Sequence, residues 1–283
     1  MTADSFLDRM LNASRERVGL ARAQESEAAL RARAMRKAAP PTLRLGEFDL
    51  IAELKLRSPA AGALAEPDFD RHAQLNAYAT GGAAAISVLT EPDEFNGSLA
   101  HLQEAASALE PHGIPAMRKD FLTDPYQVLE AKAAGAGGVL VIVTMLTDAE
   151  VEALLACARE CGLFVLLEAF NADDLARIVK LVDARPPGPE AAPVLCGVNC
   201  RDLKSLAVDF DRFAALAEHL PEGLTAVAES GVRGVDEIRA LAQLGYRAAL
   251  VGSALMQSSE PVAAVARLIA AGTERLAEMR ACS

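Results

Sequence analysis

Short apolar runs recur along the chain and alternate with segments of helical spacing. Eight runs are rich in Val, Ile, Leu and Ala and are bounded by Gly, Pro or Asp, which predicts strands. Several are almost continuously apolar, as is typical of strands buried on both faces of a parallel sheet. The runs lie at residues 49–56, 84–90, 115–121, 138–146, 163–170, 194–201, 224–230 and 248–255.

The segments between the runs have apolar positions three or four residues apart, which predicts helices. One of them has Thr147 as the expected N-cap and Gly162 as the expected stop. Eight strands each followed by a helix predict the α/β class and a single closed (β/α)8 barrel, the TIM-barrel fold. An open doubly wound sheet is the alternative, but it seldom needs eight strands, and no Gly-x-Gly-x-x-Gly follows the first run. The helices are expected at residues 69–79, 99–109, 125–134, 148–162, 172–182, 210–219, 235–244 and 261–279.

The first 47 residues come before any predicted strand. Residues 5–30 have the pattern of one charged amphipathic helix. We therefore expect residues 1–47 to form an N-terminal helical extension packed on the barrel, and residues 48–283 to form the barrel as the catalytic domain. The proline-rich segment 185–193 is predicted to be a structural loop at the amino-terminal face of the barrel.

Composition narrows the class of protein. A chain of 283 residues that is 52% hydrophobic and 24% charged suits a globular protein with a sizeable core, not a disordered one. Aromatic residues are only 4%, so the core must be built from smaller aliphatic side chains. The formal charge of −11 disfavours binding to nucleic acid, because phosphate backbones would be repelled.

The sequence indicates a cytoplasmic protein without a membrane segment. No stretch approaches the roughly 20 apolar residues that span a bilayer, and the first 19 residues mix charged with apolar side chains, unlike a signal peptide. The five cysteines show no Cys-x-x-Cys pair, which excludes a disulfide scaffold or a zinc ribbon. Cys157 and Cys161 are four residues apart in a predicted helix, and we expect them to be buried or inert thiols.

Charged and polar side chains interrupt the apolar runs close to their carboxyl ends, where the active site of a (β/α)8 barrel lies. Side chains two apart share a face of a strand, so Glu53 with Lys55, and Asn199 with Arg201, form pairs. Burying unpaired charges costs on the order of several kcal/mol per ion. A structural ion pair would explain any one of these residues equally well, but five converging strand ends favour a catalytic site. The candidates are Glu53, Lys55, Arg118, Lys119, Glu168, Asn199, Arg201, Glu229 and Ser230.

Lysine and glutamate are the expected acid/base groups. The four histidines fall in predicted helices or loops, away from the strand ends. Desolvation and a neighbouring cation lower the pKa of a lysine. We therefore expect Lys119, beside Lys55, to have a lowered pKa that suits proton donation.

Small turns follow the last two predicted strands. Ser230-Gly231 and Gly252-Ser253 leave room for an anion, and the loops after strands 7 and 8 of such barrels commonly bind phosphate. Each dipeptide alone also fits an ordinary turn. Their placement at adjacent strand ends predicts a small phosphorylated metabolite as substrate.

Over about residues 5–270 the chain resembles the indole-3-glycerol phosphate synthase family. The order and spacing of the shared motifs are together highly specific. They are Ile51-Ala-Glu-Leu-Lys55 with Ser58-Pro59, Thr90-Glu-Pro92 with Phe95-Asn-Gly-Ser98, Arg118-Lys-Asp-Phe121, Glu168, Gly197-Val-Asn199 with Arg201-Asp-Leu203, Glu229-Ser-Gly231, and Gly252-Ser253 with Leu255-Met256.

The resemblance implies closure of the pyrrole ring of 1-(2-carboxyphenylamino)-1-deoxyribulose 5-phosphate, with release of carbon dioxide and water and with neither metal nor organic cofactor. It implies Lys119 as the general acid at the ketone, Glu168 as the proton-transferring partner in dehydration, and Lys55 as the partner of the anthranilate carboxylate. The remaining roles are positioning by Glu53, Asn199 and Glu229, an apolar slot of Phe95, Phe121 and Leu203, phosphate binding by Ser58, Ser230, Gly231, Gly252 and Ser253, and orientation of the ring-bearing end by Arg201.

The chain departs from the family pattern at several positions that carry no assigned chemistry, which leaves open a changed rate, a changed loop motion or a modified anthranilate ring. We expect a monomer or weak oligomer, with a complex with neighbouring pathway enzymes left open. The departures are Leu56, Ala60, Ala61, Glu94, Phe170 and Cys200.

Two other functions compete with this interpretation. A phosphoribosylanthranilate isomerase would share the fold but use a Cys and an Asp, and the first strand here has no Cys. A non-catalytic paralogue that binds a metabolite or a partner enzyme would be favoured by loss of Lys119 or Glu168, and both are present.

Overall fold

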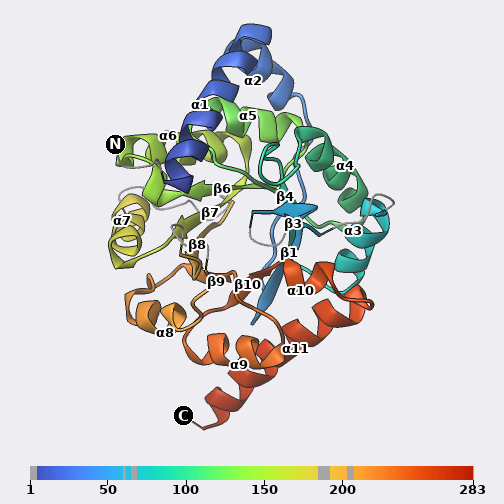
Figure 1. Cartoon of the computed structure of the whole chain (residues 1–283), viewed down its shortest axis with the longest axis vertical. Coiled ribbons are helices and arrows are strands. Elements are labelled where there is room, and N and C mark those ends of the chain that lie inside the picture. The colour runs from blue at the N-terminus through green and yellow to red at the C-terminus, as the bar shows by residue number, and fades with distance from the viewer. Residues whose placement is uncertain (1–4, 60–61, 65–68, 184–191, 203–206, 283) are drawn as a thin grey trace.

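The described residues form a closed barrel of eight parallel strands in the order β1-β10-β9-β8-β7-β6-β5-β4 (Figure 1). This computed structural model describes residues 5–59, 62–64, 69–183, 192–202 and 207–282. It confirms the (β/α)8 barrel and all eight predicted strands, each of which ends before its apolar run does. The strands are β1 (Asp49–Leu54), β4 (Ala85–Leu89), β5 (Ala116–Lys119), β6 (Gly138–Ile142), β7 (Phe164–Ala169), β8 (Val194–Asn199), β9 (Thr225–Glu229) and β10 (Ala248–Val251).

Strand ends were overestimated because polar or turn-forming residues leave the ladder early. After Ile142, residues Val143–Met145 form a short 3-10 helix, η2, although their apolar run continues. After β10, Ser253–Met256 form the short helix α10 where a strand was expected to continue to residue 255. The residues just beyond each strand therefore form the loops at the carboxyl end of the barrel.

Helices surround the barrel at the predicted positions (Figure 1). Thr147 caps α6 and exchanges hydrogen bonds with Glu150, and Gly162 ends it in a left-handed conformation, as predicted. None of the helices in the described part of the chain is long and apolar enough to cross a membrane. The helices are α3 (Arg71–Thr80), α4 (Leu99–Leu109), α5 (Pro125–Ala133), α6 (Asp148–Cys161), α7 (Ala172–Asp183), α8 (Arg212–Leu216), α9 (Val235–Gln243) and α11 (Pro261–Ala281), with the 3-10 turns η1 (Glu110–His112) and η3 (Ala217–His219).

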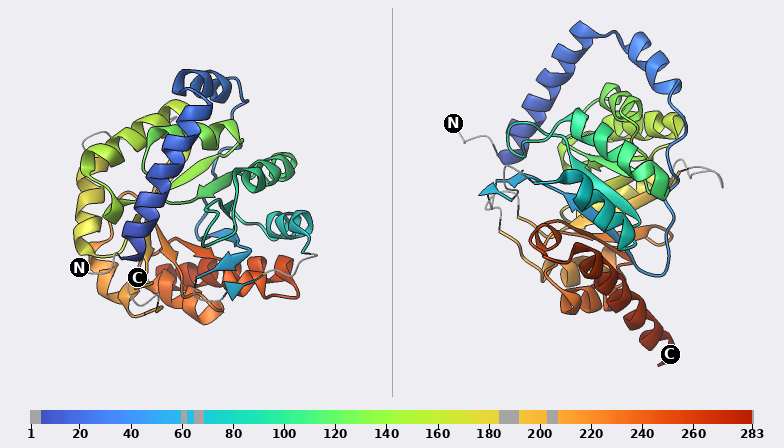
Figure 2. Two further views of the ribbon diagram at one scale, coloured as in Figure 1. Left: turned by 45° about the horizontal axis from the view of Figure 1, so that its top comes forward. Right: turned by 90° about the vertical axis from the view of Figure 1, so that its right-hand side faces the viewer.

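The prediction of one helix over residues 5–30 is wrong. The segment forms α1 (Phe6–Gln24) and α2 (Glu27–Met35), because Glu25 is extended and Ser26 accepts a hydrogen bond from the Ala29 N–H as the N-cap of a new helix. Figure 2 shows α1 starting on the side of the molecule that carries the hairpin of β2 (Arg57–Ser58) and β3 (Gly62–Ala63), with α2 turning back along the barrel. The division into an extension and a barrel domain at residue 47 stays a prediction.

Two loops differ in what the sequence predicted for them. After β1 the chain forms a two-stranded hairpin of β2 (Arg57–Ser58) and β3 (Gly62–Ala63), which the sequence did not predict. The proline-rich segment 185–193 falls mostly outside the described residues.

The core has two layers. One lies between strands and helices and includes the buried Cys157 and Cys161, which confirms the expected burial of these thiols. The other fills the barrel interior with inward-facing side chains such as Met117, Leu166 and Phe164. Gly138 admits the Phe164 ring, because a Cβ at residue 138 would lie 2.3 Å from a ring carbon.

Gly138→Ala should lower the free energy of unfolding by about 1–3 kcal/mol, because the Phe164 ring must move within a packed interior. Urea unfolding measures this. Gly19→Ala is the matched control: no atom lies within 4 Å of a Cβ at this exposed position of α1. The control should stabilise the chain by about 0.5–1 kcal/mol. Equal effects of the two substitutions would contradict the packing argument.

Candidate active site

A pocket opens at the carboxyl ends of the barrel strands and encloses about 1080 Å³ of space, part of it open to solvent. Of the predicted site residues, the structure leaves untested Ser58, whose side chain is not described, and Leu203, which lies outside the described residues. Arg118 does not line the pocket, which brings together the other predicted residues, namely Glu53, Lys55, Phe95, Lys119, Phe121, Glu168, Asn199, Arg201, Glu229, Ser230, Gly231, Gly252 and Ser253.

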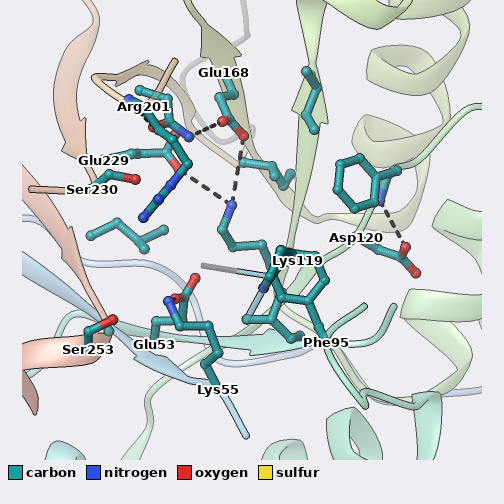
Figure 3. A pocket seen from close by; sticks show the side chains of 18 of the residues that line it. Glu53, Lys55, Phe95, Lys119, Asp120, Glu168, Arg201, Glu229, Ser230 and Ser253 are labelled. Carbon is teal, nitrogen blue, oxygen red and sulfur yellow. Dashed lines mark hydrogen bonds and ion pairs between the residues drawn. The ribbon is translucent and has the colours of Figure 1, made fainter. Parts of the chain in front are cut away.

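Lys119 stands at the centre of the charged part of this pocket (Figure 3). Its Nζ lies 3.6 Å from Glu229 Oε2 and 3.8 Å from Glu168 Oε2. Asn199 donates a hydrogen bond of 2.5 Å to the other oxygen of Glu168. The pairing of β8 with β9 sets Asn199 opposite Glu229, so strand register places these groups at one level of the barrel.

The expected lowering of the Lys119 pKa is wrong. Burial by itself would lower this pKa, but the carboxylates of Glu168, Glu229 and Glu53 together raise it above the ordinary lysine value. Lys55, the cation expected to act on Lys119, contacts Glu53 instead. Lys119 therefore holds its proton firmly in the free site.

The pKa of Glu229 is also shifted by its surroundings. This side chain is 1% exposed and lies near a second carboxylate, that of Glu168. Burial raises its pKa well above the ordinary value, Glu168 raises it further, and Lys119 only partly offsets both effects. Both Glu229 oxygens and Oε2 of Glu168 lack a hydrogen-bond partner among the described residues. Each of these buried oxygens can therefore accept a proton, or a hydrogen bond from a hydroxyl group, of a ligand that reaches it.

Glu53 and Lys55 form a second charged pair at the end of β1, with 2.6 Å between Oε1 and Nζ. Burial would raise the pKa of Glu53, but Lys55, Lys119 and Arg201 lower it below the ordinary value. Gly252 makes room for this pair, because a Cβ there would lie 2.5 Å from Glu53 Oε1 and 3.1 Å from Lys55 Nζ. Gly252 thus has a steric role that the sequence did not indicate.

The expected phosphate turns lie side by side, because β9 pairs with β10. Ser230 and Gly231 follow one another in the left-handed region, with φ of 71° and 79°. Their sharp turn brings both residues to the pocket wall beside Gly252 and Ser253. These four residues contribute only small side chains to the wall.

Aromatic rings form another part of the wall. Phe95 and Phe121 lie 6.2 Å apart between ring centroids, and Phe6 of α1 packs edge-on against Phe121 at 5.9 Å. Sequence reasoning missed Phe6 and its neighbour Leu7, because nothing in an amphipathic helix pattern says which barrel loop it will meet. Other lining residues that it did not assign to the site are Pro59, Leu89, Asp120, Leu140, Ile142, Phe170, Val232, Leu250 and Val251.

Arg118 does not join the pocket although it precedes Lys119. Successive side chains of a strand alternate in direction, and Arg118 instead pairs with Asp120 at 2.9 Å and Glu130 at 3.0 Å. Within the described residues, no group of three or more His, Cys, Asp or Glu side chains is placed to hold a metal ion.

Comparison with known proteins finds the same family by a family model and by individual relatives. A family model described as indole-3-glycerol phosphate synthase matches residues 7–268. An indole-3-glycerol phosphate synthase of Mycolicibacterium gilvum (strain PYR-GCK) is 40% identical, over 96% of this chain and 97% of that protein. One of Arthrobacter sp. (strain FB24) is 42% identical, over 82% of this chain and 80% of that protein.

Solved structures share the fold at low identity. The 3-hexulose-6-phosphate synthase of Salmonella typhimurium superposes with a TM-score of 0.61 at 15% identity, covering 82% of this chain and 99% of that one. Thiamine phosphate pyrophosphorylase of Pyrococcus furiosus gives 0.55 at 14% identity, covering 81% and 98%. These likenesses support the barrel fold alone.

Glu229→Gln should change how stability depends on pH. A carboxyl whose pKa is higher in the folded than in the unfolded chain favours folding at low pH, and this contribution is lost as the pH rises above about 4.3, the unfolded value. The variant lacks this loss. The melting temperature of the variant minus that of the parent chain should therefore increase between pH 5 and pH 8.

Glu150→Gln serves as the control, because hydrogen bonds from Thr147 lower the pKa of Glu150. Its carboxyl is ionised in both states throughout that pH range, so the difference from the parent chain should stay constant. If the melting temperatures of Glu229→Gln and of the parent chain differed by the same amount at every pH, the pKa of Glu229 would not be raised in the folded chain.

Proposed function

This chain belongs to the indole-3-glycerol phosphate synthase family, and from that premise we propose that it acts as a carboxy-lyase of tryptophan biosynthesis. It converts 1-(2-carboxyphenylamino)-1-deoxyribulose 5-phosphate to indole-3-glycerol phosphate, releasing carbon dioxide and water. The observation that supports this most directly is the half-buried Lys119 ammonium between two carboxylates, with aromatic rings on one side and small turns on the other. Its work in the cytoplasm, as a monomer or weak oligomer, stays a prediction.

The shape of the proposed substrate matches the distribution of groups in the pocket. In the barrel order, β9 and β10 lie across from β5 and β6. A phosphate at Ser230 and Ser253 would therefore be separated from an aryl ring at Phe95 and Phe121. Figure 3 shows Ser230 and Ser253 apart from Phe95, with Lys119 between them. The ketone-bearing chain between these two ends would cross the mouth next to Lys119.

The proposed chemistry uses Lys119 as the general acid and Glu168 as its partner in dehydration. The raised Lys119 pKa keeps the proton in place until an oxygen with developing negative charge accepts it. Glu168 Oε2 lies 3.8 Å from Lys119 Nζ and accepts no hydrogen bond from the described residues, while Asn199 donates one to the other oxygen. Glu229 shares the neighbourhood of Lys119 and would position both the ammonium and the substrate hydroxyls.

Two binding roles complete the proposal. Lys55 would pair with the anthranilate carboxylate, with Glu53 holding its ammonium in place, and Arg201 would orient the ring-bearing end.

The competing isomerase would need a reactive thiol. Cys196, which lies on β8, is buried, and burial followed by the nearby Glu229 raises its pKa to about 12, which disfavours that reaction.

Supplying the carboxyphenylamino-deoxyribulose phosphate and recording indole absorbance and fluorescence tests the function directly. The chain contains no tryptophan, so the protein adds no indole emission of its own to that of the product. A folded chain that forms no indole from this substrate would overturn the proposal.

Lys119→Ala and Glu168→Gln should each lower kcat by about 10²–10⁴ while changing substrate affinity far less, the usual contribution of general acid or base catalysis. Lys55→Ala should weaken substrate binding as well, if it pairs with the carboxylate. Lys180→Ala, an exposed position of α7, is the control and should leave both constants unchanged. A Lys119→Ala enzyme with near-normal kcat would place the acid elsewhere, with Lys55 examined next.

Ser253→Asp should raise KM by about 10-fold or more, because it places a negative charge where the phosphate is proposed to bind. Ser253→Asn has nearly the same size without the charge and should change KM much less. Ser253 is exposed in the pocket mouth, so both variants should fold. Equal KM values for the two variants would move the phosphate site away from these turns. Gly252 is less suitable for this test, because any side chain there meets Glu53.

A further inference from the structure

Arg17 of helix α1 lies against two carboxylates that belong to different barrel loops. Its Nη2 is 3.0 Å from Asp120 Oδ1, and its Nη1 is 3.4 Å from Glu91 Oε1. Both acidic side chains are buried, whereas the Arg17 side chain is 26% exposed. An arginine fork can hold two acceptors at once, which a lysine cannot do with the same geometry.

Glu91 organises the loop between β4 and α4. Its carboxylate accepts hydrogen bonds from three successive backbone N–H groups, those of Asp93 at 3.1 Å, Glu94 at 2.7 Å and Phe95 at 3.1 Å. The position of the Phe95 backbone is therefore set by Glu91 Oε2, and Arg17 contacts Oε1 of the same carboxylate.

Asp120 organises the loop between β5 and α5 and directly follows Lys119. Its Oδ1 accepts the Phe121 N–H at 2.8 Å, and its Oδ2 accepts the Thr90 hydroxyl at 2.7 Å and Arg118 Nη2 at 2.9 Å. The backbone that carries both Lys119 and Phe121 is thus tied to the second carboxylate that Arg17 contacts.

The third element is α1 itself, which carries Phe6 into the pocket. Phe6 packs on Phe121, and Phe121 lies next to Phe95. Each of the three rings comes from a different element, and Arg17 forms ion pairs that connect all three elements: α1, the Glu91 loop and the Asp120 loop.

We propose that Arg17 is a positioning residue for the aryl-binding part of the pocket: it sets the placement of Phe6, Phe95 and Phe121 relative to one another. This inference rests on the proposed function, in which these rings receive the aromatic end of the substrate. Without Arg17, Arg118, which pairs with Asp120, would be the one cation in the described part of the chain left in contact with either buried carboxylate. The uncompensated charge would then drive the two loops apart.

The test compares Arg17→Ala with Arg15→Ala. Arg15 is the matched control, because it also lies on α1 and pairs with a barrel helix, at 2.8 Å from Glu150, but at an exposed site outside the pocket. We expect Arg17→Ala to raise KM by about 10-fold with kcat within about 3-fold of the parent value, since ring binding and not proton transfer is disturbed. Arg15→Ala should change neither constant by more than about 2-fold.

A binding measurement separates this inference from the proposed function. The probe is indole-3-glycerol phosphate, whose fluorescence is free of tryptophan background in this chain. Its dissociation constant should rise about 10-fold in Arg17→Ala, parallel to KM. If the parent chain neither forms indole nor binds this probe, the proposed function fails. If the parent chain does both and Arg17→Ala behaves like Arg15→Ala, the Arg17 inference alone fails.

Arg17→Lys and a double variant cover the case in which Arg17→Ala does not fold. Arg17→Lys keeps the charge between the carboxylates, so it should fold and give a KM between those of the parent chain and Arg17→Ala. Adding Glu91→Gln to Arg17→Lys should raise KM by less than the sum of the separate effects, because both act through one contact. Parent-like KM in Arg17→Lys together with full additivity would overturn the inference.

Discussion

The mouth of this barrel depends on one physical requirement: the half-buried ammonium of Lys119 needs negative charge beside it. Desolvating an ion costs on the order of several kcal/mol, and β1, β7 and β9 each present a carboxylate that offsets this cost. The carboxylates are themselves buried and must be satisfied in turn, Glu168 by Asn199 and Glu53 by Lys55. The result is a cluster whose members cannot be changed one at a time without leaving a buried charge unpaired.

That cluster also explains the close backbone approaches around it. A Cβ at Gly197 would lie 2.2 Å from Glu229 Oε1, and one at Gly252 would meet Glu53. The absence of side chains at these two positions lets the carboxylates turn inward. In the proposed reaction the same crowding benefits catalysis, because it fixes charged groups beside the proton-donating ammonium and leaves buried carboxylate oxygens without a hydrogen-bond donor among the described residues.

Polar contacts outside the cluster connect it to the apolar part of the pocket. Lys119 is followed at once by Asp120, which binds Arg17 and the Phe121 backbone. Helix α1, remote from the strands in sequence, thereby becomes part of the pocket wall. The pocket therefore combines a charged centre with an aromatic wall of fixed geometry, as a substrate with an aryl ring at one end and a phosphate at the other requires.

The sequence by itself determined the eight strands, their helices and the grouping of charged residues at strand ends, because strand burial and helix capping are local patterns. It did not determine the direction of the Lys119 pKa shift, the break at Glu25 within the expected helix, or the arrival of Phe6 in the pocket. Those were decided by tertiary structure. Register brings three carboxylates, not another lysine, to the Lys119 ammonium, and α1 reaches the site through contacts with loops about one hundred residues away, as with Arg17 and Asp120. A local sequence pattern cannot show which residues so far apart in the chain will be in contact.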